Sequence, residues 1–363
     1  MLWILLKLRW ITSLIDRMNK FILILLAPLG VVYRFIIWVR NLFYDVGVFH
    51  SKELPCKVVS IGNLSLGGTG KTPAVIALSK YFQKQAVSVA VLSRGYGRKT
   101  KKTVLVTDGN EIQSDWHSVG DEAFLIAHSL KNIPVVVDNN RVRGGNYLIK
   151  NFNPDIIILD DAFQHRRIKR DIEIVLLNCI ETLENHRLIP FGNLREPLGQ
   201  LKRADIIILS KTNLGDFPEN IHIEQFSNGV LHEAYIEAET FLLDKNQAKI
   251  PSHNYHNKKC VLVTGVGSPD GVLKIAHKMD LNIATHLRFR DHHVYNENDS
   301  KKINKAIIEK KCDYILTTEK DMIKLCSVSD KNIALSLSNE IYSLPIRFVF
   351  QDKTLDMIRT KLC

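Results

Sequence analysis

The sequence predicts an α/β fold: a doubly wound sheet domain, a smaller C-terminal α/β domain and an N-terminal membrane helix. Three observations support this prediction. After Asp45, short apolar runs rich in β-branched residues alternate with helical stretches, which is the pattern of parallel strands covered by helices. A glycine-rich loop follows the first of these runs, and an apolar segment fills much of the first forty residues.

Six continuous apolar runs predict strands that are buried on both faces, as in a parallel sheet. These runs are Val58–Ile61, Val87–Leu92, Pro134–Val137, Ile156–Leu159, Ile172–Leu177 and Ile206–Leu209. The stretch Ala74–Phe82, which follows the glycine-rich loop, predicts a helix.

A second α/β pattern begins near Cys260. Strands are predicted at Val261–Thr264 and Tyr314–Leu316, and Ile346–Phe350 is a late strand that we expect to return to the domain boundary. We place that boundary in the polar stretch 228–245. The predicted regions are a membrane-associated N-terminus (1–44), a sheet domain with the glycine-rich loop (45–230) and a C-terminal α/β domain with a strand linker (231–363).

The composition fits a folded protein with anionic partners. Of the 363 residues, 45% are hydrophobic and 24% are charged, and the formal net charge is +11. This composition argues against disorder, and the basic balance suits an anionic membrane surface or a phosphorylated substrate. Nucleic acid is disfavoured because no RNP-type aromatic motif or zinc-finger spacing is present. The six cysteines include no CxxC pair, which fits a reduced cytosolic setting.

The apolar run Phe21–Val39 predicts a membrane-associated helix. Its only charge is Arg34, and as a helix it would extend about 28 Å, just enough for a bilayer core. Positive charges flank both ends, so the sequence does not decide the orientation. The helix is expected to span the bilayer or to lie in its interface, and a buried N-terminal helix is the alternative. Met18 is a second candidate start besides Met1.

The segment Ser65–Thr72, SLGGTGKT, resembles a P-loop between a strand and a helix. Gly67 and Gly68 have no Cβ atoms, so successive backbone N–H groups can face phosphate oxygens. Lys71 is expected to reach the β- and γ-phosphates of a nucleotide, and Thr72 to ligate Mg²⁺. A plain glycine turn is the alternative. The residues assigned to nucleotide binding are Ser65, Gly67, Gly68, Thr69, Gly70, Lys71 and Thr72.

Two aspartates, Asp160 and Asp161, follow the predicted strand Ile156–Leu159. Carboxylates in this position lie at the carboxyl edge of the sheet, beside the P-loop, and can hold Mg²⁺ directly or through water. Turn formation is the alternative. Gln164 and His165 come next, and they could face the nucleotide or the acceptor, or belong to a solvated helix face.

Three further segments carry polar groups whose role the residues alone leave open. The loop Ser93–Arg98, SRGYGR, could hold anionic groups or be a basic surface turn. Asp121 and Glu122 precede the apolar run Ala123–Ala127, where they could serve catalysis or belong to a helix cap. The string DHH at 291–293 could bind a metal or have a structural role.

Taken in order, several strings resemble the tetraacyldisaccharide 4′-kinase family, the lipid A 4′-kinases of Gram-negative bacteria. They are VVSIGNLSLGGTGKTP, LSRGYGR, VGDEA, DDAFQHR, GNLREP, FRDHH and TEKD. Ser65 in place of the usual first P-loop glycine is itself a trait of this family. Arg290, before the DHH string, departs from the small residue or proline usual there.

The resemblance implies an activity and its partners. ATP, with Mg²⁺, would give its γ-phosphate to the 4′-hydroxyl of the lipid A disaccharide 1-phosphate, forming lipid IVA. The acyl chains of this acceptor stay in the bilayer. The enzyme is therefore expected at the inner (cytoplasmic) membrane, in contact with its lipid, with the active site facing the cytoplasm. No nucleic acid and no obligate protein partner are expected.

The resemblance also implies roles for individual residues. Asp121 matches a general base that takes the hydroxyl proton, and His292 matches the partner that orients it. Because these two come from different predicted domains, catalysis would require the cleft to close. The metal residues implied are Thr72, Asp160, Asp161 and Glu122. The residues implied near ATP or the acceptor are Tyr96, Gln164, His165 and Arg195.

Two other functions share some of these features. A membrane-associated P-loop ATPase or GTPase switch of the partitioning type would have the same loop, acidic strand end and membrane helix. It lacks support from a guanine-reading NKxD motif, of which SKTN at 210–213 is only a faint echo. A phosphoesterase of the DHH class does not explain the P-loop.

Overall fold

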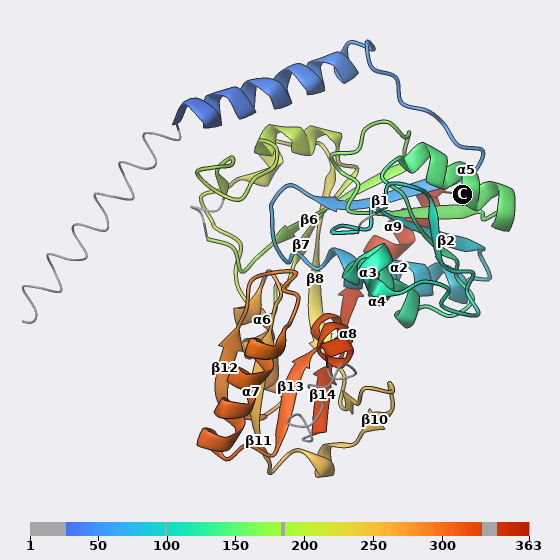
Figure 1. Ribbon diagram of the computed structural model, residues 1–363. Helices are drawn as coiled ribbons and strands as arrows, with labels where there is room; N and C mark the ends of the chain where they lie inside the picture. Colours follow the sequence, from blue (N-terminus) through green and yellow to red (C-terminus); the bar gives the residue numbers. More distant parts are fainter. Residues whose placement is uncertain (1–26, 99, 183–185, 329–339, 363) are drawn as a thin grey trace, which may run out of the picture.

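Two β-sheets form the framework of the molecule (Figure 1). The computed structural model describes residues 27–98, 100–182, 186–328 and 340–362. Within these residues the larger sheet has nine strands, in the spatial order β15 (Ile346–Phe350), β8 (Val230–Ala238), β7 (Ile206–Ser210), β6 (Ile172–Asn178), β1 (Lys57–Asn63), β5 (Ile156–Asp160), β2 (Val89–Ser93), β4 (Val135–Val137) and β3 (Val104–Thr107). The smaller sheet has six in the same ranges, in the order β10 (Lys249–Ile250), β9 (Leu242–Leu243), β14 (Glu340–Leu344), β13 (Tyr314–Thr318), β11 (Lys259–Thr264) and β12 (Asn282–Arg288).

The centre of the larger sheet is parallel. β1 lies between β5 and β6, in a register that places Lys57 opposite Ile156 and Asn63 opposite Leu176. Among its described strands, only the edge strands β3 and β15 run antiparallel to their neighbours. Parallel strands end at the same edge, so the segments that follow β1, β2, β5 and β6 meet on one side of the sheet.

Helices cover both faces of each sheet. Alternate residues of a strand point to opposite faces: Ile158 packs with Leu78 in one core cluster, whereas Ile157 packs with Leu148 in another. The helices are α2 (Lys71–Lys84), α3 (Trp116–Val119), α4 (Asp121–Ser129), α5 (Arg141–Phe152), α6 (Pro269–Lys278), α7 (Glu297–Lys310), α8 (Glu319–Val328) and α9 (Asp352–Leu362). The larger sheet is therefore doubly wound, which confirms the predicted α/β class.

Two strands tie the sheets together. The chain leaves the larger sheet through β8 and returns to it from β14 through β15, with only Pro345 between them. β15 pairs with β8 from Ile346 opposite Ala238 to Phe350 opposite Ala234. One cluster of buried side chains runs from the larger sheet into the smaller one. The two sheets thus share core as well as chain.

The strands predicted from apolar runs are all present, and the return of Ile346–Phe350 to the larger sheet is confirmed. The helix predicted after the glycine-rich loop is α2. Six of the described strands lie outside the apolar runs that predicted strands: β3, β8, β9, β10, β12 and β14. β12 and much of β8 are only partly buried, so polar residues interrupt their apolar pattern. The domain division stays a prediction; its boundary at 230/231 falls at the start of β8.

A helix covers residues 27–45 and lies across the end of the molecule formed by the larger sheet (Figure 1, blue). It includes the described part of the predicted segment Phe21–Val39; residues 21–26, like Met1 and Met18, lie outside the described residues. In the described ranges, no helix is long and apolar enough to cross a membrane. The spanning form of the predicted membrane helix therefore has no support in this part of the chain.

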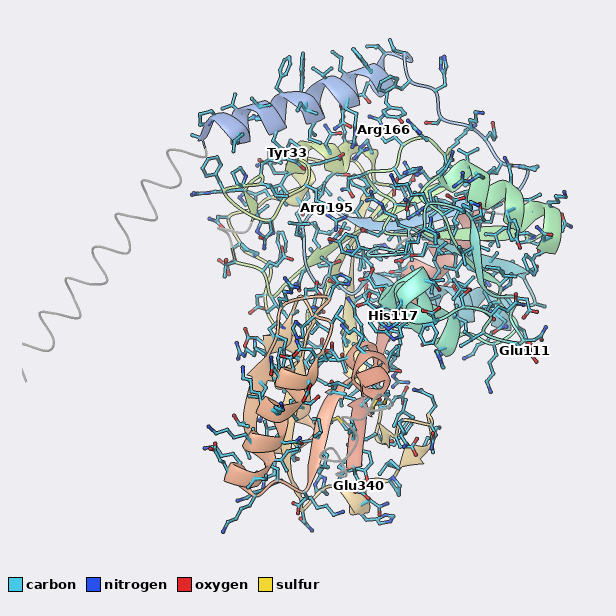
Figure 2. All side chains as sticks on the ribbon, in the orientation of Figure 1. Tyr33, Glu111, His117, Arg166, Arg195 and Glu340 are labelled. Carbon is cyan, nitrogen blue, oxygen red and sulfur yellow. The ribbon has the colours of Figure 1, made fainter. Side chains whose placement is uncertain are left out.

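Polar contacts hold this helix on the body of the protein. The hydroxyl of Tyr33 donates a hydrogen bond to the carbonyl of Arg195 at 2.8 Å. The guanidinium of Arg166 donates to the Asp45 carboxylate at 2.8 Å and to the Asn41 carbonyl at 3.2 Å. Figure 2 shows Tyr33 and Arg166 at the junction between the helix and the body.

The role of β15 in joining the sheets can be tested with Phe348→Ala. Phe348 is 4% exposed, and its ring lies 3.4 Å from the position that a Cβ of Gly70 would occupy. We expect the free energy of unfolding to fall by about 3–5 kcal/mol, measured by urea denaturation. The control is Arg347→Ala, which removes an exposed, solvent-screened ion pair with Glu237 and should leave the free energy of unfolding nearly unchanged. Equal losses would contradict this view of β15.

Candidate active site

The glycine-rich loop connects β1 to α2 and has the backbone of a phosphate cradle. Gly67 and Gly70 have φ values of +111° and +90°, in the left-handed region that glycine adopts without steric cost. α2 begins at Lys71, directly after Gly70, so the free N–H groups of its first turn are available to an anion at the loop. The strand–loop–helix arrangement predicted from the sequence is confirmed.

Asp160 and Asp161 lie at the end of β5, next to β1 in the sheet. Ser93 Oγ donates a hydrogen bond to Asp160 Oδ2 at 2.8 Å, and the buried Asp160 Oδ1 has no hydrogen-bond partner among the described residues. Burial, together with the negative charges of Glu122 and Asp161, raises the pKa of Asp160 to about 7. A cation near Oδ1 would stabilise the ionised carboxylate and so lower the pKa of Asp160.

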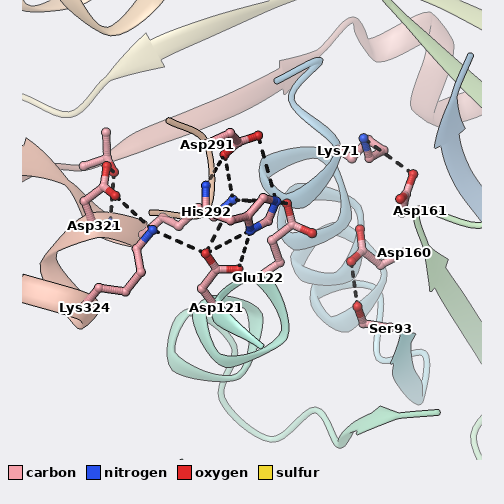
Figure 3. A network of polar contacts seen from close by, with 12 residues as sticks. Lys71, Ser93, Asp121, Glu122, Asp160, Asp161, Asp291, His292, Asp321 and Lys324 are labelled. Carbon is pink, nitrogen blue, oxygen red and sulfur yellow. Dashed lines mark hydrogen bonds and ion pairs between the residues drawn. The ribbon is translucent and has the colours of Figure 1, made fainter. Parts of the chain in front are cut away.

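Asp161 is bound by two cationic side chains. Lys71 Nζ lies 3.5 Å from its Oδ1, and an Arg195 guanidinium nitrogen lies 3.0 Å from its Oδ2. Burial acts to raise the pKa of Asp161, but the charges of Lys71 and Arg195 outweigh burial and hold this pKa well below its usual range. The P-loop lysine is therefore oriented by the end of β5 (Figure 3).

Asp121 and His292 meet across the two sheets. Asp121 is the first residue of α4, and His292 lies in the loop after β12, 171 residues later. His292 Nδ1 lies 3.0 and 3.1 Å from the two carboxylate oxygens of Asp121 (Figure 3). Since the carboxylate can only accept, Nδ1 donates. Asp121 therefore bonds a side chain of the other sheet rather than capping a helix.

The electrostatics of this pair favour its charged form. Burial acts to raise the pKa of Asp121, but the hydrogen bond from His292 and the charges of Lys320 and Lys324 hold it well below its usual range. Burial acts to lower the pKa of His292, but the hydrogen bond to Asp121 and the charges of Asp121 and Glu122 raise it overall. The contact is thus a carboxylate–imidazolium pair at pH values below the pKa of His292.

Two lysines of α8 extend from the smaller sheet into this cluster. Lys320 Nζ lies 3.4 Å from both Glu122 Oε1 and Asp291 Oδ1. Lys324 Nζ lies 3.4 Å from Asp121 Oδ2. Burial acts to lower the pKa of Lys320, yet the surrounding carboxylates raise it. These cations offset the repulsion that the crowded carboxylates would otherwise exert on one another.

Tyr96, in the loop after β2, also belongs to this site. Its ring centroid lies 4.9 Å from that of His292. The close packing of this loop against α4 depends on Gly120, which has a φ of +91° and where a Cβ would lie 2.6 Å from the Tyr96 carbonyl oxygen. Glycine at this position therefore lets Tyr96 approach the Asp121–His292 pair.

Gln164 and His165 lie at a pocket whose lining includes no P-loop residue. Gln164 Nε2 donates a hydrogen bond to the Asn63 carbonyl at 2.9 Å. Both residues line a pocket of about 960 Å³ that also contains Arg94 and Arg167. Burial and nearby arginine charges lower the pKa of His165 to about 3, so its imidazole is neutral. We call this hollow the basic pocket.

The acidic residues fit a Mg²⁺ ion that is shared with phosphates. The described residues contain no group of three or more His, Cys, Asp or Glu side chains arranged to hold an ion by themselves. Mg²⁺ commonly takes one or two carboxylates and completes its shell with phosphate oxygens and water. The unpartnered Oδ1 of Asp160, with Glu122 close enough to raise its pKa, matches this donor set.

Comparison with known proteins identifies the family. The family described as tetraacyldisaccharide-1-P 4′-kinase matches residues 22–363.

This chain belongs to that family.

The relatives cover nearly the whole chain. A tetraacyldisaccharide 4′-kinase of Chlorobium limicola is 37% identical over 319 residues, which is 86% of this chain and 90% of the relative. One from Syntrophus aciditrophicus is 35% identical over 351 residues, 93% of each. A crystal structure of the Aquifex aeolicus family member in complex with ATP superposes with a TM-score of 0.74 at 29% identity, covering 93% of this chain and 98% of that one.

Membership in the tetraacyldisaccharide-1-P 4′-kinase family decides between the functions left open by the sequence. A match that extends from residue 22 to the C-terminus favours the kinase over a nucleotide-dependent switch or a DHH-class phosphoesterase. The histidines of the DHH string agree with this: His292 bonds Asp121, and His293 Nε2 lies 2.8 Å from Asp299.

Three residues of this site had no role assigned from the sequence. Lys320 belongs to the TEKD string after β13, and Lys324 lies about one turn further along α8. Their position just past a strand end was the available signal. Arg141 is fully buried and donates to the carbonyls of Asp138 and Asp160 at 2.7 and 2.9 Å. No local pattern distinguishes it from a surface arginine at a helix start.

The charge balance around His292 predicts two opposite changes in its pKa. Asp121→Asn removes the hydrogen-bonded negative charge and should lower the pKa, whereas Lys320→Met removes a positive charge that lowers it and should raise it. NMR titration of the His292 ring protons would measure both. The resonance of the exposed His256 serves as the control that neither substitution should move. Shifts in the same direction would contradict the proposed charge arrangement.

Proposed function

We propose that this protein transfers the γ-phosphate of ATP to the 4′-hydroxyl of a tetraacylated glucosamine disaccharide 1-phosphate, which yields lipid IVA. The observation that carries the proposal is the meeting of two sites at one sheet edge. The P-loop, with Lys71 and Asp161, suits nucleotide phosphates. The Asp121–His292 pair lies beside it, and the carboxylate of Asp121 can act as a base. Relatives that match 86% and 93% of this chain bear the name of this kinase activity.

On the donor side, the chain supplies positioning and positive charge. Phosphoryl transfer depends mainly on alignment and charge neutralisation. The loop amides and Lys71 would hold the β- and γ-phosphates, and Arg195, already paired with Asp161, adds a second cation nearby. Thr72, Asp160 and Glu122 would hold Mg²⁺, with Asp161 beside them. When bound, Mg²⁺ would neutralise phosphate charge.

On the acceptor side, Asp121 would receive the proton of the 4′-hydroxyl. Its low pKa makes it a weak base, which suits a reaction in which the hydroxyl proton is lost late, after most of the bond to the leaving group has broken. His292 holds the carboxylate by hydrogen bonding through Nδ1. In this proposal His292 orients Asp121, and Tyr96 closes the site over His292.

The protein has two hollows along the N-terminal helix that could receive the rest of the acceptor. The basic pocket is lined by Arg94, Arg166 and Arg167 and by Arg40 of the helix, and it suits a sugar phosphate. A second hollow of about 330 Å³ is mostly apolar and lies between the same helix and Pro197. We assign the 1-phosphate of the acceptor to the first and part of its acyl region to the second.

The outer face of this helix supports a place at the inner (cytoplasmic) membrane. Six apolar side chains are more than half exposed in the described structure: Leu29, Val31, Val32, Phe35, Ile36 and Trp38. The opposite face is held to the protein by Tyr33 and Arg40. An amphipathic helix docked in this way would lie in the membrane interface, with the site facing the cytoplasm.

Transfer of label from γ-labelled ATP to the lipid disaccharide tests the activity. Asp121→Asn should lower turnover by about 10²-fold or more while the ATP dissociation constant changes less than about threefold, because the described ion pairs of Asp121 are with His292, Lys320 and Lys324 rather than with the P-loop. Lys71→Ala should cripple the use of ATP. Lys57→Ala, at the exposed opposite end of β1, is the matched control. Hydrolysis of ATP without labelled lipid would overturn the proposal.

Flotation with vesicles that contain anionic lipid tests the membrane proposal. Phe35→Glu and Trp38→Glu should each reduce binding severalfold, since each replaces an apolar group that would enter the interface by a charge. Ile308→Glu is the matched control, because Ile308 is 76% exposed but lies on α7 of the smaller sheet. If all three variants floated like the unmodified protein, the helix would not be the membrane contact.

A further inference from the structure

The carbonyl groups of the P-loop are bound from behind by side chains of neighbouring strands. Asn63 Nδ2 donates to the Ser65 carbonyl at 2.7 Å. Ser210 Oγ donates to the Thr69 carbonyl at 2.9 Å, and Lys211 Nζ donates to the carbonyl of Gly68. A peptide whose C=O is fixed on one side presents its N–H to the other side, so these contacts turn the loop amides toward the phosphates.

Lys211 is the charged member of this group. It follows β7 directly, with a φ of +64° that is uncommon for a residue with a Cβ. The residue is 6% exposed, and its ammonium group ends at the carbonyl of Gly68. Burying a charged lysine costs folding free energy unless the charge is paired or hydrogen-bonded. The family resemblance assigns no role to Lys211.

We propose that Lys211 is a positioning residue of the phosphate loop: its ammonium group fixes the Gly68 peptide so that the loop amides face the nucleotide, and it adds a second positive charge behind the phosphates. The inference rests on the proposed use of ATP. It also gives a role to Ser65, the residue that replaces the first P-loop glycine. Ser65 Oγ donates to Glu181 Oε1 at 3.1 Å, and Glu181 is the acid that interacts with Lys211.

The groups around Lys211 set its protonation. Burial lowers its pKa to about 8, Glu181 acts to raise it, Lys71 acts to lower it further and Cys179 acts weakly to raise it. The phosphates of ATP would add negative charge near the ammonium and raise this pKa. The complex then binds more protons than the free protein, so ATP binding takes up protons near pH 8.5 and weakens as pH rises through about 8.

The first experiment compares ATP kinetics of Lys211→Met with those of the unmodified protein. Methionine keeps the length of the chain and removes the donor and the charge. We expect the KM for ATP to rise about tenfold or more, with the KM for the lipid acceptor unchanged. Lys305→Met, at a 74% exposed side chain on α7, should behave like the unmodified protein. An unchanged KM for ATP in a folded Lys211→Met would overturn the inference.

The second experiment measures proton uptake by calorimetry of MgATP binding at pH 8.5 in two buffers with different ionisation enthalpies. The unmodified protein should take up a fraction of a proton, and Lys211→Met should not. This measurement on the unmodified protein stands even if the variant fails to fold. ATP binding without proton uptake overturns the role of Lys211 and leaves the proposed function intact. Absence of ATP binding overturns both.

Discussion

The contact between Asp121 and His292 is the interaction on which the site depends. It joins the first turn of α4, which packs on the larger sheet, to a loop of the smaller sheet. Neither sheet has a complete site: the P-loop and the acidic end of β5 lie on one, and His292, Lys320 and Lys324 lie on the other. β8 and β15 pair with each other in the larger sheet and carry the chain to and from the smaller one, so two connections hold the sheets together where this contact forms.

Because the loop edges of the two sheets face each other, the acidic groups of one can be neutralised by cations of the other. Carboxylates from α4, β5 and the loop after β12 gather in a small volume, and in low dielectric they would repel strongly. The cations that neutralise them come mostly from the facing sheet or from loops across the edge, as with Lys320 beside Glu122 and Arg195 beside Asp161. Asp160 is the exception, since it keeps a buried oxygen without a partner. The protein neutralises every acid of the cluster except the one best placed for a metal.

The parts of this site that depend on neighbours in sequence could be predicted. The P-loop needs only a strand, glycines and a lysine in order, and Asp160 needs only a buried strand before it. Lys211 and Lys320 could not be assigned from the residues, because their value comes from strands and helices that pack against them from far along the chain. β8 was read as a polar boundary, since its partial burial hides its period. The pairing of Asp121 with His292 came from family resemblance, as no local pattern links residues 171 apart.

The docking of the N-terminal helix has a consequence for how the acceptor is reached. Tyr33 bonds the backbone of Arg195, Arg195 bonds Asp161, and Asp161 bonds Lys71. A helix tied to the catalytic groups by so short a chain cannot swing freely like an anchor on a tether. If its outer face rests at a lipid interface, the height of the transferred phosphoryl group above the head groups is fixed by the thickness of protein between them. The sugar of the lipid must then extend from the interface to that height. Substrates would be selected by how far the sugar reaches from the membrane, in addition to how well it fits the pocket.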